Sequence, residues 1–252
     1  MLRSLYQFDQ AEVLKIVTTL LATNEEDTAY LGTYHRGRHN VETLLLFDNA
    51  SHFQAVAMLS RSLFELAVDI RLLEIIPLGH LKMIVAAHAE RLRCARKAID
   101  FKRSHPDANL DVTVQTLFVA KDAPEIERKQ AILWTGAKRI EHWSGYNLKE
   151  RVSLLKEPFE QIYETEYPQL SWHAHAGLAG VANLNAETFI FMCSWGFKLA
   201  VDSYWEMLST IIKKYKISLV DEKIGKKMEA AKMLPFTNSP DEAEGLLKTL
   251  LR

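Results

Sequence analysis

The chain has 252 residues, of which 48% are hydrophobic and 25% are charged, and both shares are ordinary for a globular protein. Its 31 lysines and arginines nearly balance its 32 aspartates and glutamates, and the net charge of -1 argues against a dedicated nucleic-acid binder, though not against a local basic groove. Two cysteines make no disulfide framework, no apolar run opens the chain and no 18-residue stretch is both apolar throughout and free of charge. We therefore expect a reducing, cytoplasmic location with no secretory signal and no membrane partner.

Helical periodicity covers most of the chain, while glycine and proline are sparse and strand-like alternation is absent. Asp9 is the expected N-cap of the first helix, and Pro124 is expected to open a helix of its own because proline suits a first helical turn. In chain order, helices are expected over residues 8–22, 27–48, 52–76, 80–103, 111–120, from 124 onward, 147–155, 158–167, 168–181, 186–216 and 241–251.

These elements predict an all-α fold, a multi-helix bundle of roughly eight to ten helices. No internal repeat, low-complexity tract or clear linker divides the chain. We expect a single bundle domain over residues 1–217, followed by a C-terminal appendage, 218–252, that holds one short amphipathic helix. A homodimer is the expected oligomeric state, since two-fold dimers are the commonest assemblies of soluble proteins.

The helix predicted over 52–76 carries polar side chains on two sides instead of one. Arg61, Glu65 and Asp69 fall on one side of the helical wheel, and further polar residues fall roughly opposite them. One interpretation is a solvated stripe with an Arg61–Glu65 ion pair worth about 0.5 kcal/mol. The other is a polar pocket inside the bundle, where helical folds build their sites.

A second candidate is the segment His142-Trp143-Ser144-Gly145. Trp143 is expected to anchor a turn against the core, and Gly145 permits a backbone conformation that other residues resist. His142 is then held rigidly, either as an acid/base or ligand residue, because histidine titrates near neutrality, or as a loop histidine that satisfies nearby carbonyl groups.

A third candidate repeats polar side chains at every fourth position, Tyr167, Ser171 and His175. A serine and a histidine one helical turn apart suggest an activated nucleophile. No Gly-x-Ser-x-Gly elbow surrounds Ser171, which argues against a hydrolase of that kind. The alternative is that these groups fill polar gaps between helices.

The segment 34–39 is a dense basic patch. His35, His39 and Glu42 have metal-ligand spacing on a helix, but Arg36 and Arg38 flank them and disfavour a divalent ion. Phosphate binding is at least as well supported. The chain also lacks a P-loop, a dinucleotide fingerprint and the common zinc and di-iron motifs, so we expect no metal and no cofactor.

Three ordered motifs resemble a bacterial all-helical family whose function is unknown. Its members carry A-x-x-L-x-R-S-L-F-E, then H-W-S-G, then Y-x-x-L-S-x-x-x-H, and the resemblance covers about residues 38–180. Here the first motif is one residue shorter before its arginine, running from Ala57 to Glu65. The resemblance implies that five residues converge on one site: Arg61, Glu65, His142, Ser171 and His175.

Helical bacterial proteins of this kind resemble products of toxin or phage-defence loci, some of which are ribonucleases with Arg-x4–6-His. None of the nine histidines here has an arginine five to seven residues before it. If the chain is a ribonuclease, it either is not of that kind or takes its arginine and histidine from different helices, as Arg61 with His142 or His175 would be.

Two hypotheses from different classes stay open. In the first, the chain is a toxin or phage-defence effector that acts on RNA or a phosphate ester, with an antitoxin or operon partner. Arg61 then stabilises the phosphate, Glu65 orients Arg61, and His142 or His175 serves as general acid/base. Its candidate substrate-binding residues are Arg36, Arg38, His39, Trp143 and Tyr167. In the second, the chain is a non-catalytic binding or scaffold module with a structural buried polar network.

Overall fold

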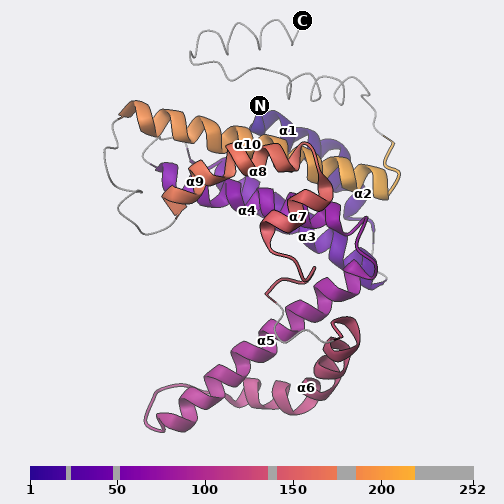
Figure 1. Cartoon of the computed structure of the whole chain (residues 1–252), viewed down its shortest axis with the longest axis vertical. Coiled ribbons are helices and arrows are strands. Elements are labelled where there is room, and N and C mark those ends of the chain that lie inside the picture. The colour runs from indigo at the N-terminus through magenta and orange to yellow at the C-terminus, as the bar shows by residue number, and fades with distance from the viewer. Residues whose placement is uncertain (21–23, 48–51, 136–140, 175–185, 219–252) are drawn as a thin grey trace, which may run out of the picture. The chain divides into compact units, whose positions relative to one another are not determined.

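The computed structural model describes residues 1–20, 24–47, 52–135, 141–174 and 186–218. Within these ranges every regular element is a helix, which confirms the all-α prediction (Figure 1). The described residues form two compact units, each built from separate stretches of the chain: the first takes residues 1–21, 34–67 and 166 onward, the second 22–33 and 68–165. Two of the four boundaries, after residues 33 and 67, fall inside helices, where no linker composition marks them, and the single bundle domain over residues 1–217 stays a prediction.

The first unit contains the chain's N-terminal segment and its longest helix. Its elements are α1 (Leu2–Phe8), the π-helical segment η1 (Asp9–Val13), α2 (Leu14–Val17), the later part of α3 (Glu25–Leu44), most of α4 (Phe53–Leu72), α9 (Tyr167–Ala174) and α10 (Ala186–Lys214).

Glycines let α10 approach its neighbours closely. A Cβ atom on Gly196 would lie 2.7 Å from Val56 Cγ1, and one on Gly37 would clash with the Met207 side chain. Tight helix packing therefore accounts for both glycines.

The second unit is centred on two long helices, α5 (Gly79–Ser104) and α6 (Thr113–Leu133), which lie side by side (Figure 1). Leu92 of α5 packs against Ala123 and Ile126 of α6 in a small apolar core. Two shorter helices, α7 (Leu148–Leu155) and α8 (Phe159–Thr165), complete the unit together with the first part of α3 and the end of α4.

The predicted helix over 111–120 and the one expected from Pro124 are a single helix, α6, with Pro124 inside it. An internal proline costs about 3 kcal/mol because it removes one hydrogen bond and crowds the preceding turn. Burial of Ala123 and Ile126 on either side of it offsets that cost, so packing against α5 overrides the local preference.

Asp9 is not the N-cap that the sequence indicated. The first helix already begins at Leu2, and Asp9 lies inside a continuous helical run as the first residue of η1. Its side chain is fully buried and bonded to other elements. By contrast, the predicted start at 147 is confirmed, because Asn147 and Glu150 form a reciprocal capping box on α7.

The predicted C-terminal helix over 241–251 and nearly all of the appendage lie outside the described residues. Among the helices that are described, none combines the length and the apolar character that a membrane crossing needs.

Candidate functional site

The turn that holds His142 has the geometry that its sequence indicated. Gly145 adopts a φ of 82°, a left-handed conformation that favours glycine, and its N–H donates to the His142 carbonyl at 2.9 Å. Trp143 is buried, and a Cβ atom on Gly79, at the start of α5, would lie 3.3 Å from its ring. Trp143 therefore anchors the turn in the core, and its substrate-binding role stays a prediction.

Both ring nitrogens of His142 have partners inside the second unit. Nδ1 lies 2.7 Å from Ser144 Oγ and 3.2 Å from the Ser144 backbone nitrogen. Nε2 lies 3.2 and 3.3 Å from the two carboxylate oxygens of Asp69, near the end of α4. We assign the ring proton to Nδ1, which donates to Ser144 Oγ, because Arg151 Nη1 lies 2.9 Å from Nε2 and arginine can only donate, so Nε2 is the accepting nitrogen.

Arg151 of α7 completes this cluster. Its Nη1 donates to Asp69 Oδ1 at 2.8 Å and lies 2.9 Å from His142 Nε2, so arginine and histidine face one carboxylate together. The Arg151 side chain is only 7% exposed, against 15% for Asp69 and 21% for His142. Its buried Nε has no hydrogen-bond partner among the described residues. We call these three residues with Ser144 the His142 cluster.

The members of the His142 cluster were not all predicted as site residues from the sequence. Asp69 stood on the polar side of its predicted helix but was not among the candidate site residues, and Arg151 was missed. The only sequence signal for Arg151 was its place in the next helix, nine residues after His142 and four after the capping Asn147. The cluster pairs His142 with Arg151, whereas the sequence indicated Arg61 for that place, and the Arg61 pairing stays a prediction.

Arg61, Glu65 and Tyr167 meet in a second cluster, inside the first unit. Arg61 Nη2 donates to the Tyr167 hydroxyl at 2.7 Å, and that hydroxyl donates to Glu65 Oε1 at 2.8 Å. The Arg61 guanidinium also lies over the Tyr167 ring, 4.7 Å from its centroid. Burial raises the pKa of Tyr167. Arg61 and Glu65 themselves are 3.9 Å apart, so the tyrosine links them more closely than a direct ion pair does.

This second cluster is neither a solvated stripe nor a closed pocket. The Arg61 side chain is 18% exposed and the Glu65 side chain 40%. Ser171, one turn after Tyr167, donates its hydroxyl to the Tyr167 carbonyl at 3.0 Å and thus satisfies its own helix. His175 lies outside the described residues, and His142 belongs to the other unit, so the expected convergence of all five residues stays a prediction.

The basic segment of α3 is divided between the interior and the surface. Arg36 and His39 are exposed, and His39 Nδ1 lies 3.0 Å from Glu42 Oε2. Arg38 is buried and bonds Glu42, Asp9 and the Tyr6 hydroxyl. Its guanidinium is therefore bonded within the protein, and the substrate-binding role of Arg36, Arg38 and His39 stays a prediction.

Asp9 is the centre of a buried network that the sequence did not reveal. Its carboxylate accepts from the Tyr34 hydroxyl at 2.5 Å, the Tyr204 hydroxyl at 2.7 Å and Arg38 Nε at 3.1 Å. Burial raises the pKa of Asp9 even though these three donors act to lower it. Burial likewise raises the pKa values of Tyr34 and Tyr204. The network joins η1, α3 and α10, and its lack of exposed surface indicates a structural role.

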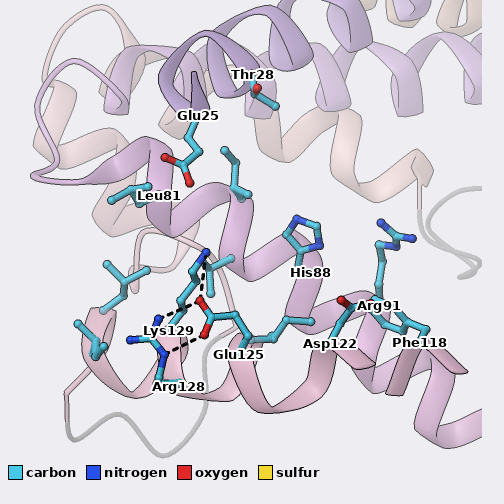
Figure 2. Close-up of a pocket in the computed structure, with 15 residues that line it drawn as sticks. Glu25, Thr28, Leu81, His88, Arg91, Phe118, Asp122, Glu125, Arg128 and Lys129 are labelled. Carbon is cyan, nitrogen blue, oxygen red and sulfur yellow. Dashed lines mark hydrogen bonds and ion pairs between the residues drawn. The ribbon is translucent and has the colours of Figure 1, made fainter. Parts of the chain in front are cut away.

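A pocket of about 680 Å³ lies in the second unit, between the first turn of α3, the first half of α5 and residues 118–133 of α6 (Figure 2). Its walls include the apolar Leu81, Val85 and Ile126, and charged side chains surround them. Glu125 is bonded to Arg128 on the rim, as the dashed lines in Figure 2 mark. The volume falls in the range of small-molecule sites, and apolar walls with a few polar groups are typical of them.

The part of the chain that the structure describes contains no group of three His, Cys, Asp or Glu side chains arranged to hold a metal ion. Comparison with protein-family models, with curated proteins and with solved structures finds no match to the chain.

Proposed function

We propose that the chain is an effector enzyme of the toxin or phage-defence type that cleaves RNA or a related phosphate ester at the His142 cluster. The observation that carries the proposal is the meeting of His142 Nε2 and Arg151 Nη1, 2.9 Å apart, on one carboxylate. Histidine supplies a proton acceptor and donor near neutral pH, and a guanidinium stabilises the charge on a phosphate. Three segments of the second unit contribute these groups, which is how helical folds assemble polar sites.

The roles follow from which atoms are held and which are accessible. Ser144 holds Nδ1 inside the turn, so Nε2 is the nitrogen that can exchange a proton with substrate. A substrate phosphate would take the place of one Asp69 oxygen beside Nε2, and Arg151 would then bind both anions. Asp69 and Ser144 are positioning residues, because they orient the ring without touching substrate.

The reaction that suits this arrangement is intramolecular transesterification of RNA. The 2′-hydroxyl loses its proton to His142 and its oxygen attacks phosphorus, while the bond from phosphorus to the 5′-oxygen breaks. The leaving oxygen takes a proton from water or from His142, and the products are a 2′,3′-cyclic phosphate and a 5′-hydroxyl. Arg151 stabilises the extra charge on the phosphoryl oxygens in the transition state.

The test is growth of a bacterial host after induced expression, with total RNA separated on a gel. Wild type is compared with His142→Gln, which keeps hydrogen-bonding groups but cannot transfer a proton near neutral pH, and with Arg151→Lys, which keeps the charge but loses the planar fork. His52→Gln is the matched control, because His52 is an exposed histidine that belongs to neither the cluster nor the candidate substrate-binding residues. Soluble protein levels and far-UV circular dichroism must match.

Toxicity with RNA breakdown in wild type and His52→Gln, relieved in both cluster variants, supports the proposal. Equal toxicity in all four proteins contradicts the assignment of the site. Growth that is unaffected by every protein, together with no cleavage of RNA by the purified wild type, contradicts the function.

One observation favours a second function, the non-catalytic binding module. The pocket of about 680 Å³ between α3, α5 and α6 is large enough for a small ligand, and it contains none of the His142 cluster. A thermal-shift screen of small amphipathic compounds tests this function. The expected shift disappears in Val85→Trp, which fills the pocket wall, whereas a shift that persists in that variant places the ligand elsewhere.

A further inference from the structure

The strongest charge asymmetry in the chain lies on α5. This helix carries seven lysines and arginines against two carboxylates, a net charge of +5, whereas the whole chain carries -1. The excess gathers in its second half, where residues 91–103 contain six lysines and arginines and one aspartate. A basic stripe on a chain that is otherwise acidic is the electrostatic signature of a polyanion partner.

These cations are displayed to solvent. Arg93 and Arg103 are 54% and 76% exposed, and Lys97 is exposed as well. Their carboxylate partners, Glu90 and Asp100, are more than half exposed too. Ion pairs in this setting are worth little, so a phosphate can replace the carboxylate at low cost.

An aromatic platform continues the same stripe. Arg93, Lys97, Phe101 and His105 follow one another at every fourth position and so lie along one side of the helix. Phe101 is 49% exposed, and its ring stacks on that of His105 with centroids 4.4 Å apart and planes 18° from parallel. A flat stacked pair of rings beside cations suits unpaired bases, which stack on aromatic side chains.

We infer that this face of α5, defined by Arg93, Lys97, Phe101 and His105, binds single-stranded RNA. The choice of RNA among polyanions rests on the proposed function. The cations contact backbone phosphates, and the Phe101–His105 stack receives a base. Such binding is independent of base sequence and weakens steeply with salt, because each phosphate contact releases counterions.

The experiment measures fluorescence anisotropy of a labelled 20-nucleotide oligouridine with the full-length chain carrying His142→Gln, so that cleavage does not disturb binding. Titrations at several salt concentrations between about 50 and 200 mM give the affinity and its salt slope. Three further variants are compared in this background: Arg93→Ala with Lys97→Ala, Phe101→Ala, and the control Lys149→Ala. Lys149 is an equally exposed cation of the same unit, on α7.

The two α5 variants have different expected signatures. Loss of Arg93 and Lys97 lowers affinity by about tenfold or more and reduces the salt slope by about 1.4, since each single-strand phosphate contact contributes about 0.7. Loss of Phe101 lowers affinity by about tenfold with an unchanged salt slope, because stacking releases no counterions. Lys149→Ala changes neither quantity.

No binding at the lowest salt, equal binding by all variants, or stronger binding to phosphatidylserine vesicles than to RNA overturns the inference. These outcomes are separable from failure of the proposed function, because binding is measured without cleavage. If the cluster variants abolish RNA breakdown while the α5 variants bind RNA normally, the function stands and the α5 surface is refuted. If the α5 signatures appear but no protein cleaves RNA, the surface stands and the cleavage proposal fails.

Discussion

Replacing Asp9 with alanine should lower the free energy of unfolding more than any substitution at the surface does. The Asp9 side chain has no exposed surface, and that of Arg38 is 10% exposed, so water cannot take the place of the lost carboxylate. The substitution leaves the hydroxyls of Tyr34 and Tyr204 without that acceptor and Arg38 without its buried partner.

The magnitude follows from these contacts. Removing one side of a buried ion pair costs about 3–5 kcal/mol, and stranding a buried hydroxyl costs about 1–3 kcal/mol. The three contacts share one carboxylate and are not additive, and Arg38 keeps Glu42 as a partner, so we expect a total loss of about 4 kcal/mol. Such a loss is a large share of the stability of an ordinary domain.

The assay is urea denaturation followed by far-UV circular dichroism, with Asp100→Ala as the control. Asp100 pairs with Arg103 at the surface, where both side chains are at least two-thirds exposed, so its loss should cost under about 1 kcal/mol. If Asp9→Ala does not fold, Asp9→Asn, which keeps an acceptor oxygen, should show a smaller loss. Asp9 variants that are as stable as the control would refute the structural role of this network.

Three further predictions concern the His142 cluster, the packing of α10 and the titration of Asp9. Asp69→Ala should cost about 3–5 kcal/mol in the same assay, because Arg151 is left as an unpaired buried charge, and an unchanged midpoint would show that water screens the cluster. Gly196→Ala should lower stability by about 1–3 kcal/mol, since the new Cβ would lie 2.7 Å from Val56 Cγ1, and a stabilised variant would contradict the packing. Burial raises the folded-state pKa of Asp9 above its ordinary 3.8, so protonation of Asp9 adds stability that is fully present below 3.8 and is lost as pH rises through the raised value. Wild type should therefore gain stability relative to Asp9→Asn as pH falls from neutral toward 3.8, and a constant difference would contradict that pKa shift.

The helices were predictable because apolar periodicity reports which side chains face a core. The predicted and observed bounds of the helix that carries Arg61 differ by a few residues, as helix ends usually do. The predictions that were wrong concern two residues at which tertiary contacts override the local preference of the residue type. Pro124 sits inside a helix because its neighbours pack against α5, and Asp9 lies within a helical run because donors from α3 and α10 satisfy it.

The candidate site was predictable only in part, for a similar reason. Local geometry at 142–145 followed from residue types, since a glycine with positive φ and a buried tryptophan define that turn. The partners of His142 could not be predicted from residue types, because Asp69 is 73 positions away and nothing in the sequence shows that the two residues meet. The Arg61–Tyr167 contact spans 106 positions. Helical spacing predicted both residues as candidates but not the hydrogen bond between them.

The central claim is that His142 and Arg151 together cleave a phosphodiester. Purified wild type, His142→Gln and Arg151→Lys should be incubated with end-labelled RNA, and the ends of the products identified by mass spectrometry. The account predicts fragments with 2′,3′-cyclic phosphate and 5′-hydroxyl ends from wild type, and a loss of at least about 100-fold in rate in His142→Gln. Cleavage at the wild-type rate by a folded His142→Gln protein, or products with 3′-hydroxyl ends, would contradict it.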